Sequence, residues 1–153
     1  MAFLSDGTLL ELGPSLLNPF NPDHVEPCSV DLTLADLNNK LFKDDHLMVK
    51  PFEFCLATTV EQVSLPSHLG ARVEGKSSLG RRGLFIHVTA GWIDPGFVGQ
   101  ITLELFNCTR DEIYLTRGQK ICQLAFFELD KPALRPYHGK YQNQVGIVGP
   151  RHE

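Results

Sequence analysis

The sequence has few of the features that mark membrane, disulfide-rich or nucleic-acid-binding proteins. No apolar run approaches the roughly 18 residues of a membrane span, and the opening MAFLSDGTLLELG carries no basic cluster, so we expect neither a transmembrane helix nor a signal peptide. The four cysteines form no C-x-x-C pair, which favours free thiols in a reducing cytoplasm. A net charge of −4 argues against broad binding to nucleic acid or anionic membranes.

Internal repeats and long helical periodicity are also scarce. The chain has 153 residues, of which 42% are hydrophobic and 21% charged, and we expect one domain over residues 1–153. One helix is predicted between Ser5 and Leu17, interrupted at Gly13-Pro14. The rest consists of short segments separated by 13 glycines and 10 prolines in all. This pattern is typical of an all-β sandwich, barrel or jelly roll.

Alternation and composition predict several strands. Residues 29–34, 51–63 and 120–129 are strand candidates. The clearest strand is Gln100–Phe106, in which apolar and polar positions alternate strictly. One face carries Ile101, Leu103 and Leu105, and the other carries Thr102, Glu104 and Phe106. The final residues, 137–153, are polar, and composition alone predicts a loose tail.

Residues 70–77, G-A-R-V-E-G-K-S, match the P-loop pattern G-x-x-x-x-G-K-S/T. A true P-loop joins a parallel strand to a long helix, whereas residues 71–74 are predicted as strand and no βαβ alternation follows. We therefore interpret Gly70 as an incidental match. The residues that follow are compatible with a phosphate site at the start of a helical turn, or with a solvated basic turn. They are Lys76, Ser77, Ser78, Arg81 and Arg82.

A second partial motif lies at residues 24–28, where His24-Val-Glu26 precedes Pro27-Cys28. These pieces imitate the ligand elements of zinc deaminases, but there the elements come from separate helices. The second cysteine position is Asp31 here, and three ligands cannot converge on one metal from such a contiguous stretch. We therefore expect no zinc.

Three adjacent segments form a more specific pattern: EGKSSLGRRG at 74–83, HVTAGWIDPGFVG at 87–99 and QITLELFN at 100–107. Together they closely resemble the dCTP deaminase family, which shares a superfamily with the trimeric dUTPases. Residues 3–6, 28–34, 117–124 and 140–146 resemble further segments of that family. The resemblance implies a distorted jelly roll, which is a dUTPase-like β-barrel with short helical segments, assembled as a homotrimer with sites at subunit boundaries.

The resemblance assigns catalytic roles to four residues. Glu104 would shuttle protons while water attacks C4 of cytosine and ammonia leaves. Ser77 and the backbone around Ala90 would hold that water, with Arg81 nearby. Asp94 would orient the water that attacks the α-phosphorus and would meet the 3′-hydroxyl. The sequence leaves open that Glu104 is only a solvent-facing residue of a half-exposed strand.

Further residues are implied to contact the nucleotide. Lys76, Ser78 and Arg81 would meet the phosphates; many relatives carry arginine at position 76, so lysine keeps the charge but loses the bidentate fork. Residues 137–153 would close over the nucleotide, and His87 is interpreted as structural. The residues implied to line the base pocket or approach from the fourth motif and the tail are Thr102, Leu103, Gln123, Tyr137, Lys140 and Gln144.

The surroundings of Gly91-Trp92 are most similar to bifunctional members, which convert dCTP and two waters to dUMP, diphosphate and ammonia on the route to dTTP. The alternatives are a deaminase that releases dUTP, a dUTPase without deaminase action, and a nucleotide-sensing regulatory protein. Mg²⁺ is implied as a cofactor held through the triphosphate, without protein side-chain ligands. We expect a cytoplasmic enzyme (in the host cytoplasm if viral) with dTTP as a candidate inhibitor and no nucleic-acid or membrane partner.

Overall fold

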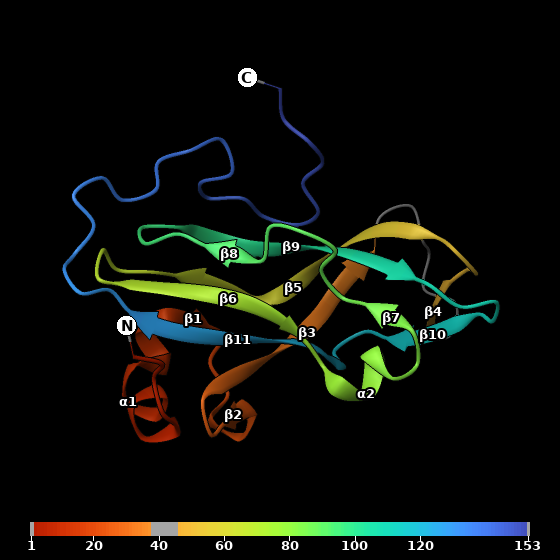
Figure 1. Cartoon of the computed structure of the whole chain (residues 1–153), viewed down its shortest axis with the longest axis horizontal. Coiled ribbons are helices and arrows are strands. Elements are labelled where there is room, and N and C mark those ends of the chain that lie inside the picture. Colours follow the sequence, from red (N-terminus) through yellow and green to blue (C-terminus); the bar gives the residue numbers. More distant parts are fainter. Residues whose placement is uncertain (1, 38–45, 153) are drawn as a thin grey trace.

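Short strands wrap around an apolar core in the computed structural model, which describes residues 2–37 and 46–152 (Figure 1). The helical elements are α1 (Asp6–Leu16), the 3-10 turn η1 (Pro22–His24) and α2 (Ser77–Gly80). The strands are β1 (Leu17–Asn18), β2 (Val25–Glu26), β3 (Ser29–Leu37), β4 (His46–Val49), β5 (Phe54–Ser64), β6 (Leu69–Gly75), β7 (Leu84–Phe85), β8 (Trp92–Ile93), β9 (Val98–Asn107), β10 (Ile113–Thr116) and β11 (Lys120–Glu128).

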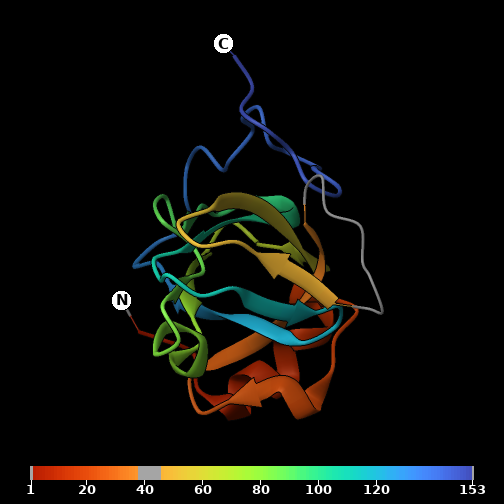
Figure 2. The same cartoon turned by 90° about the vertical axis from the view of Figure 1, so that its right-hand side faces the viewer.

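The predicted β-rich class is confirmed. The main sheet follows the order β7-β9-β5-β3-β11-β6-β8, with β1 added to β5 and β2 to β3, while β4 pairs with β10. Neighbouring strands in these pairs run antiparallel, and bulges interrupt the β3–β5 and β5–β9 registers. Bulges increase the local bend, which suits a sheet that curls on itself. Figure 2, which looks along the longest axis of the molecule, shows the strands curling around one another and the C-terminal segment above them.

Strand β9 has the two faces that its sequence predicts. Ile101, Leu103 and Leu105 are buried, whereas Thr102 and Glu104 are only half-buried. Since side chains of a strand alternate between faces, the apolar set fixes β9 on the core and directs Glu104 to the opposite side. The fold thereby presents Glu104 on a strand that is firmly anchored in the core, between β7 and β5.

Helix α1 forms where it is predicted, but the expected interruption at Gly13-Pro14 is wrong. Pro14 lies inside the continuous helix Asp6–Leu16. A proline costs the helix one hydrogen bond, and we attribute its tolerance to the burial of Leu9, Gly13 and Leu16 against the core. Gly13 is required for packing, because a Cβ there would lie 2.1 Å from the ring of Phe20.

The rejection of the P-loop is confirmed, and so is the interpretation of Gly70 as an incidental match that lies on a strand. Residues 70–75 lie in β6, and the helix that follows, α2, has only four residues. Gly70 has a packing role instead, because a Cβ at this position would lie 2.5 Å from the ring of Phe127 on the paired strand β11. The glycine therefore lets an aromatic ring cross the sheet face.

The C-terminal segment is better anchored than its composition predicts. Gln144 is buried and forms a parallel bridge with Gly99, and the backbone N–H of Asn143 donates to the carbonyl of Val98 at 2.8 Å. Figures 1 and 2 both show this segment alongside the upper edge of the barrel. Polar residues therefore order this segment through backbone contacts; Glu153 lies outside the described residues.

Helices of the described chain are all too short or too polar to cross a membrane.

Candidate active site

A pocket of about 590 Å³ lies between β9 and the C-terminal segment. It contains the predicted catalytic carboxylates Asp94 and Glu104. Thr102 joins them from β9, and Tyr137 and Gln144 join from the C-terminal segment. The structure thus brings together side chains that are up to 50 positions apart in the sequence. Apolar walls supplied by Phe54, Leu56, Val73, Phe97 and Ile101 make it suitable for a flat organic ring.

The carboxylate of Glu104 is held by the loop between β7 and β8. Thr89 donates to Oε2 twice, from its backbone N–H at 3.0 Å and from its hydroxyl at 3.2 Å. The backbone N–H of Glu104 points to Nδ1 of His87 at 3.4 Å. Because both Thr89 donors bind Oε2, the other carboxylate oxygen, Oε1, can exchange a proton with a bound water or substrate. His87 contacts the backbone of β9 and also lines the pocket.

The same loop has a strained turn. Ala90 adopts φ +57°, a left-handed conformation that costs a residue with a Cβ about 1–2 kcal/mol. It follows directly after Thr89 and lines both this pocket and the next one. Such strain is kept where the surroundings fix the backbone, and it clusters at functional sites. Here the left-handed turn at Ala90 directs the Thr89 donors toward Glu104 and places Ala90 between the two pockets.

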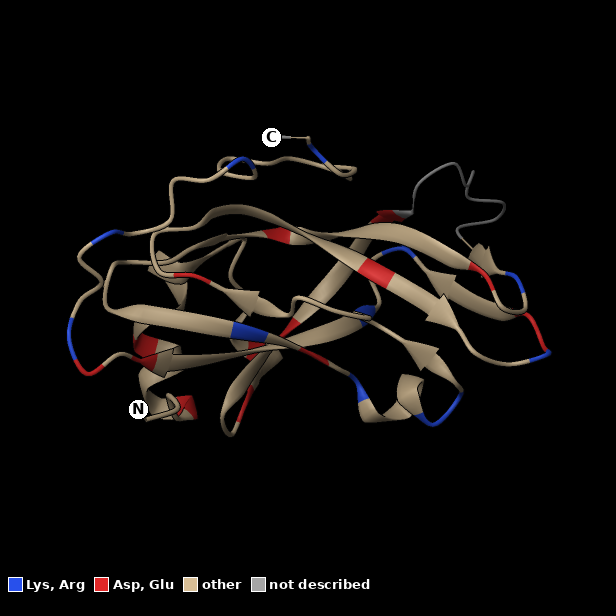
Figure 3. Ribbon diagram, turned by 45° about the horizontal axis from the view of Figure 1, so that its top comes forward, with Lys and Arg blue, Asp and Glu red and all other residues tan. Residues whose placement is uncertain are grey.

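A second pocket, of about 570 Å³, lies on the other side of that loop. It includes Lys76 and Ser77 from the junction of β6 and α2. Ser78 and Arg81 are exposed on the same turn, and basic positions flank α2 in Figure 3. A single chain therefore carries the predicted phosphate-binding turn and the two carboxylates in adjacent pockets. It does not bring Ser77 into the pocket of Glu104.

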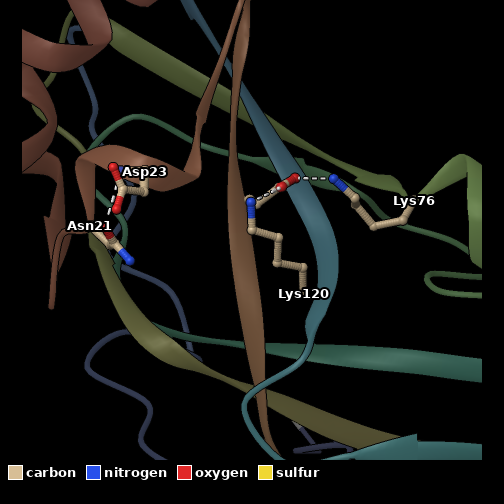
Figure 4. A network of polar contacts seen from close by, with 5 residues as sticks. Asn21, Asp23, Lys76 and Lys120 are labelled. Carbon is tan, nitrogen blue, oxygen red and sulfur yellow. Dashed lines mark hydrogen bonds and ion pairs between the residues drawn. The ribbon is translucent and has the colours of Figure 1, made fainter.

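The ammonium of Lys76 already has a partner within the chain. Its Nζ lies 2.5 Å from Oδ1 of Asp31, whose side chain is completely buried on β3. Lys120, at the start of β11, approaches Oδ2 of the same carboxylate at 3.0 Å. Figure 4 shows both lysine ammonium groups converging on one carboxylate. A phosphate contact by Lys76 stays a prediction, and it would have to be shared with Asp31.

The other implied residues lie farther from the carboxylate pocket. The side chain of Leu103 is fully buried in the core, so only its backbone can face a base. Gln123 lies on β11, paired with Asp31 and Glu74. Lys140 is exposed, with its Nζ 5.7 Å from the centre of the Tyr141 ring. These three do not line the 590 Å³ pocket.

Sequence reasoning did not single out Thr89, Tyr141 or Lys120. The position of Thr89 beside Ala90 was the available signal for its contact with Glu104. Trp92 is 53% exposed, and its ring lies against that of Phe127, with ring centres 4.7 Å apart and an interplanar angle of 41°. It is therefore a surface aromatic in the single chain.

Comparison with known proteins places this geometry in a family. The dCTP deaminase-like family matches residues 37–129. The chain belongs to that family. A dUMP-forming dCTP deaminase from Aquifex aeolicus is 45% identical, covering 94% of this chain and 89% of the relative. Another dUMP-forming dCTP deaminase, from Dictyoglomus thermophilum, is 51% identical, covering 93% of this chain and 89% of the relative.

Solved structures support the fold of this family member. The 2′-deoxycytidine 5′-triphosphate deaminase from Agrobacterium tumefaciens superposes with a TM-score of 0.68 at 22% identity, over 81% of this chain. The match spans 47%, about half, of that longer structure. An EIAV dUTPase superposes with a TM-score of 0.56 at 25% identity, over 75% of this chain and 87% of its own. Both support the deaminase and dUTPase type of β-fold.

Proposed function

We propose that this family member is a dUMP-forming dCTP deaminase, which hydrolyses dCTP to dUMP, diphosphate and ammonia. One observation carries the proposal: two carboxylates, Asp94 and Glu104, lie in the same pocket of about 590 Å³. Deamination and cleavage of the triphosphate each need a positioned water and a base, and the pocket offers one carboxylate for each. The dUMP-forming activity of the relatives, over most of their length, supports this reading.

Glu104 performs the deamination in this proposal. Its carboxylate takes a proton from water as the water oxygen bonds to C4 of cytosine. The same carboxylate delivers that proton to the ring nitrogen and then transfers the remaining hydroxyl proton at C4 to the amino group, so that the C4 carbonyl forms, the C4–N bond breaks and ammonia leaves. The sum is dCTP plus water to dUTP plus ammonia. The contacts from Thr89 hold the carboxylate in place during these transfers.

Asp94 performs the second hydrolysis. It orients a water for attack on the α-phosphorus, the bond from that phosphorus to the bridging oxygen breaks, and diphosphate leaves dUMP behind. Asp94 is exposed at the rim of the pocket, where a triphosphate can extend into solvent. The principal alternative is a deaminase that stops at dUTP, and the same pocket would serve its first step.

A homotrimer completes the site in this proposal. Ser77, Ser78 and Arg81 would reach the carboxylate pocket of a neighbouring copy, since they do not line that pocket in their own chain. Apolar side chains around the second pocket support an assembly, because Phe85, Val88 and Trp92 are each about half exposed in a single chain. A monomeric variant would lose activity even with every named side chain in place.

The nucleotide would bring Mg²⁺ with it. Among residues 2–37 and 46–152 no group of three His, Cys, Asp or Glu side chains could hold a metal ion, so the donor set fits an ion bound mainly by triphosphate oxygens. Such an ion would neutralise phosphate charge. Asp94 is the protein carboxylate in the pocket that could face a hydrated ion. We further propose a cytoplasmic enzyme that dTTP can inhibit by occupying the same pocket.

Paired variants test the division of labour. Glu104→Gln keeps the size of the side chain but removes the base, and we expect ammonia release from dCTP to be abolished while some dUTP hydrolysis survives. Asp94→Asn should impair diphosphate formation more than ammonia release. Glu11→Gln, on the exposed face of α1, is the matched control. Equal loss of both reactions in each variant, with folding intact, would contradict the assignment of one carboxylate to each step.

A further inference from the structure

A buried carboxylate with two cations lies beside the turn that the resemblance assigns to phosphate. We call Asp31, Lys76 and Lys120 the lysine clamp. Asp31 Oδ1 accepts from Lys76 Nζ at 2.5 Å, and Lys120 Nζ lies 3.0 Å from Oδ2 (Figure 4). The three residues come from β3, the residue before α2, and the start of β11. The clamp therefore ties the phosphate-binding turn to the middle of the sheet.

The clamp holds two ammonium groups and one carboxylate, which is one positive charge more than is needed to neutralise Asp31. One ammonium neutralises one carboxylate, and a second ammonium adds repulsion from the first. Stability is a weak reason for keeping it, because even a single buried ion pair contributes little net stability. The other buried carboxylate among the described residues, Glu61, accepts from the backbone N–H and the hydroxyl of Thr33, both at 2.8 Å. Those two donors satisfy Glu61 without a lysine.

The two lysines are not equivalent. Lys76 makes a short hydrogen bond, and its side chain is 21% exposed. The side chain of Lys120 is 39% exposed, and although its ammonium is close to Oδ2, that oxygen accepts no hydrogen bond in this geometry. Lys120 is thus the more loosely held cation and the one with access to solvent. An incoming anion can therefore move Lys120 away from Asp31 at a lower free-energy cost than it can move Lys76.

We propose that Lys120 is a further phosphate-binding residue and that Asp31 and Lys76 position it. On triphosphate binding, Lys120 turns from Oδ2 to a phosphate oxygen while Lys76 keeps Asp31 neutralised. Lys76 lines the 570 Å³ pocket together with Ser77, and Lys120 contacts the same Asp31 carboxylate as Lys76, so only that carboxylate separates the two ammonium groups. This inference rests on the proposed function for the identity of the ligand as a nucleoside triphosphate.

Lysine variants and two partial ligands test the proposal. Lys120→Met removes the surplus charge and leaves the Asp31–Lys76 pair, whereas Lys120→Arg keeps the charge. Lys131→Met, on the exposed loop after β11, is the matched control. We expect Lys120→Met to weaken inhibition by inorganic tripolyphosphate about tenfold and to raise KM for dCTP similarly, because a charged hydrogen bond is lost. Inhibition by deoxycytidine should stay unchanged, and Lys120→Arg should recover most of the affinity.

Several results would overturn the proposal. Unchanged binding of tripolyphosphate to Lys120→Met would do so, as would equal weakening of tripolyphosphate and deoxycytidine, which would indicate a purely structural role. Failure of tripolyphosphate to bind the wild-type chain would also overturn it. Calorimetric binding of tripolyphosphate needs no turnover, so it separates this inference from the proposed function. Tight, Lys120-dependent binding of tripolyphosphate without ammonia release from dCTP would contradict the proposed function but would still support phosphate binding by Lys120.

Discussion

The hydroxyl of Thr89 provides a sharp test of how the loop between β7 and β8 serves Glu104. Thr89→Val keeps the branched shape and the backbone N–H but removes the donor that lies 3.2 Å from Oε2. The backbone donor at 3.0 Å remains, so the carboxylate keeps one of its two anchors. We expect the carboxylate to sample orientations from which it cannot reach water and the cytosine ring.

The size of the effect can be worked from this geometry. A hydrogen bond to a charged group contributes about 1.5–3 kcal/mol. The Thr89 hydroxyl is near the long end of hydrogen-bond distances and the residue is exposed, so the lower figure applies. About 1.5 kcal/mol corresponds to roughly tenfold in rate. We therefore expect kcat for deamination to fall about tenfold, with little change in KM for dCTP.

The assay follows ammonia release from dCTP and, separately, dUTP hydrolysis by the same protein. Hydrolysis of dUTP depends on Asp94 and should be nearly unaffected, which makes it an internal control for folding. Thr89→Ser restores the hydroxyl and should recover most of kcat. If Thr89→Val is folded and deaminates within twofold of wild type, the loop does not position Glu104.

Three further predictions concern stability and the C-terminal segment. Burial raises the pKa of the Cys122 thiol, so the unfolded chain loses this proton first and stability should fall above about pH 8.5, by up to roughly 1.4 kcal/mol per pH unit. Cys122→Ala should flatten that alkaline slope in denaturant titrations. Asn107→Ala removes a buried amide whose NH₂ group shares its two hydrogens among three backbone carbonyls, and should lower the unfolding free energy by about 3 kcal/mol. Gly96→Ala should displace the start of the C-terminal segment, because Gly96 has φ +89° and a Cβ there would lie 2.9 Å from the backbone nitrogen of Tyr137. Faster proteolysis of residues 137–152 and a higher KM for dCTP would show this displacement.

Much of the fold could be predicted because its strands carry local signals. In β9 the alternation of apolar and polar residues indicated both the strand and the face of Glu104. The packing roles of Gly13 and Gly70 could not be predicted from the sequence, for the same physical reason. Each is a glycine because a distant ring, Phe20 or Phe127, occupies the space of a Cβ, and local sequence does not reveal such a neighbour.

The candidate site could be predicted only through combined motifs. Resemblance selected Asp94 and Glu104, and the structure shows that they share a pocket. It could not show that Lys76 is bound to Asp31, since that contact joins residues 45 positions apart, one on β3 and the other directly before α2. Nor could composition predict the anchored C-terminal segment, where backbone groups and the amide of Gln144 make the contacts.

Product analysis with dCTP as the sole nucleotide tests the central claim most directly. The purified protein is incubated with dCTP and Mg²⁺, and dCTP, dUTP, dUMP and ammonia are followed over time by chromatography and an ammonia assay. A dUMP-forming deaminase should yield dUMP and ammonia in equal amounts without accumulated dUTP. Persistent dUTP equal to the ammonia released would contradict the claim, and so would the absence of any ammonia.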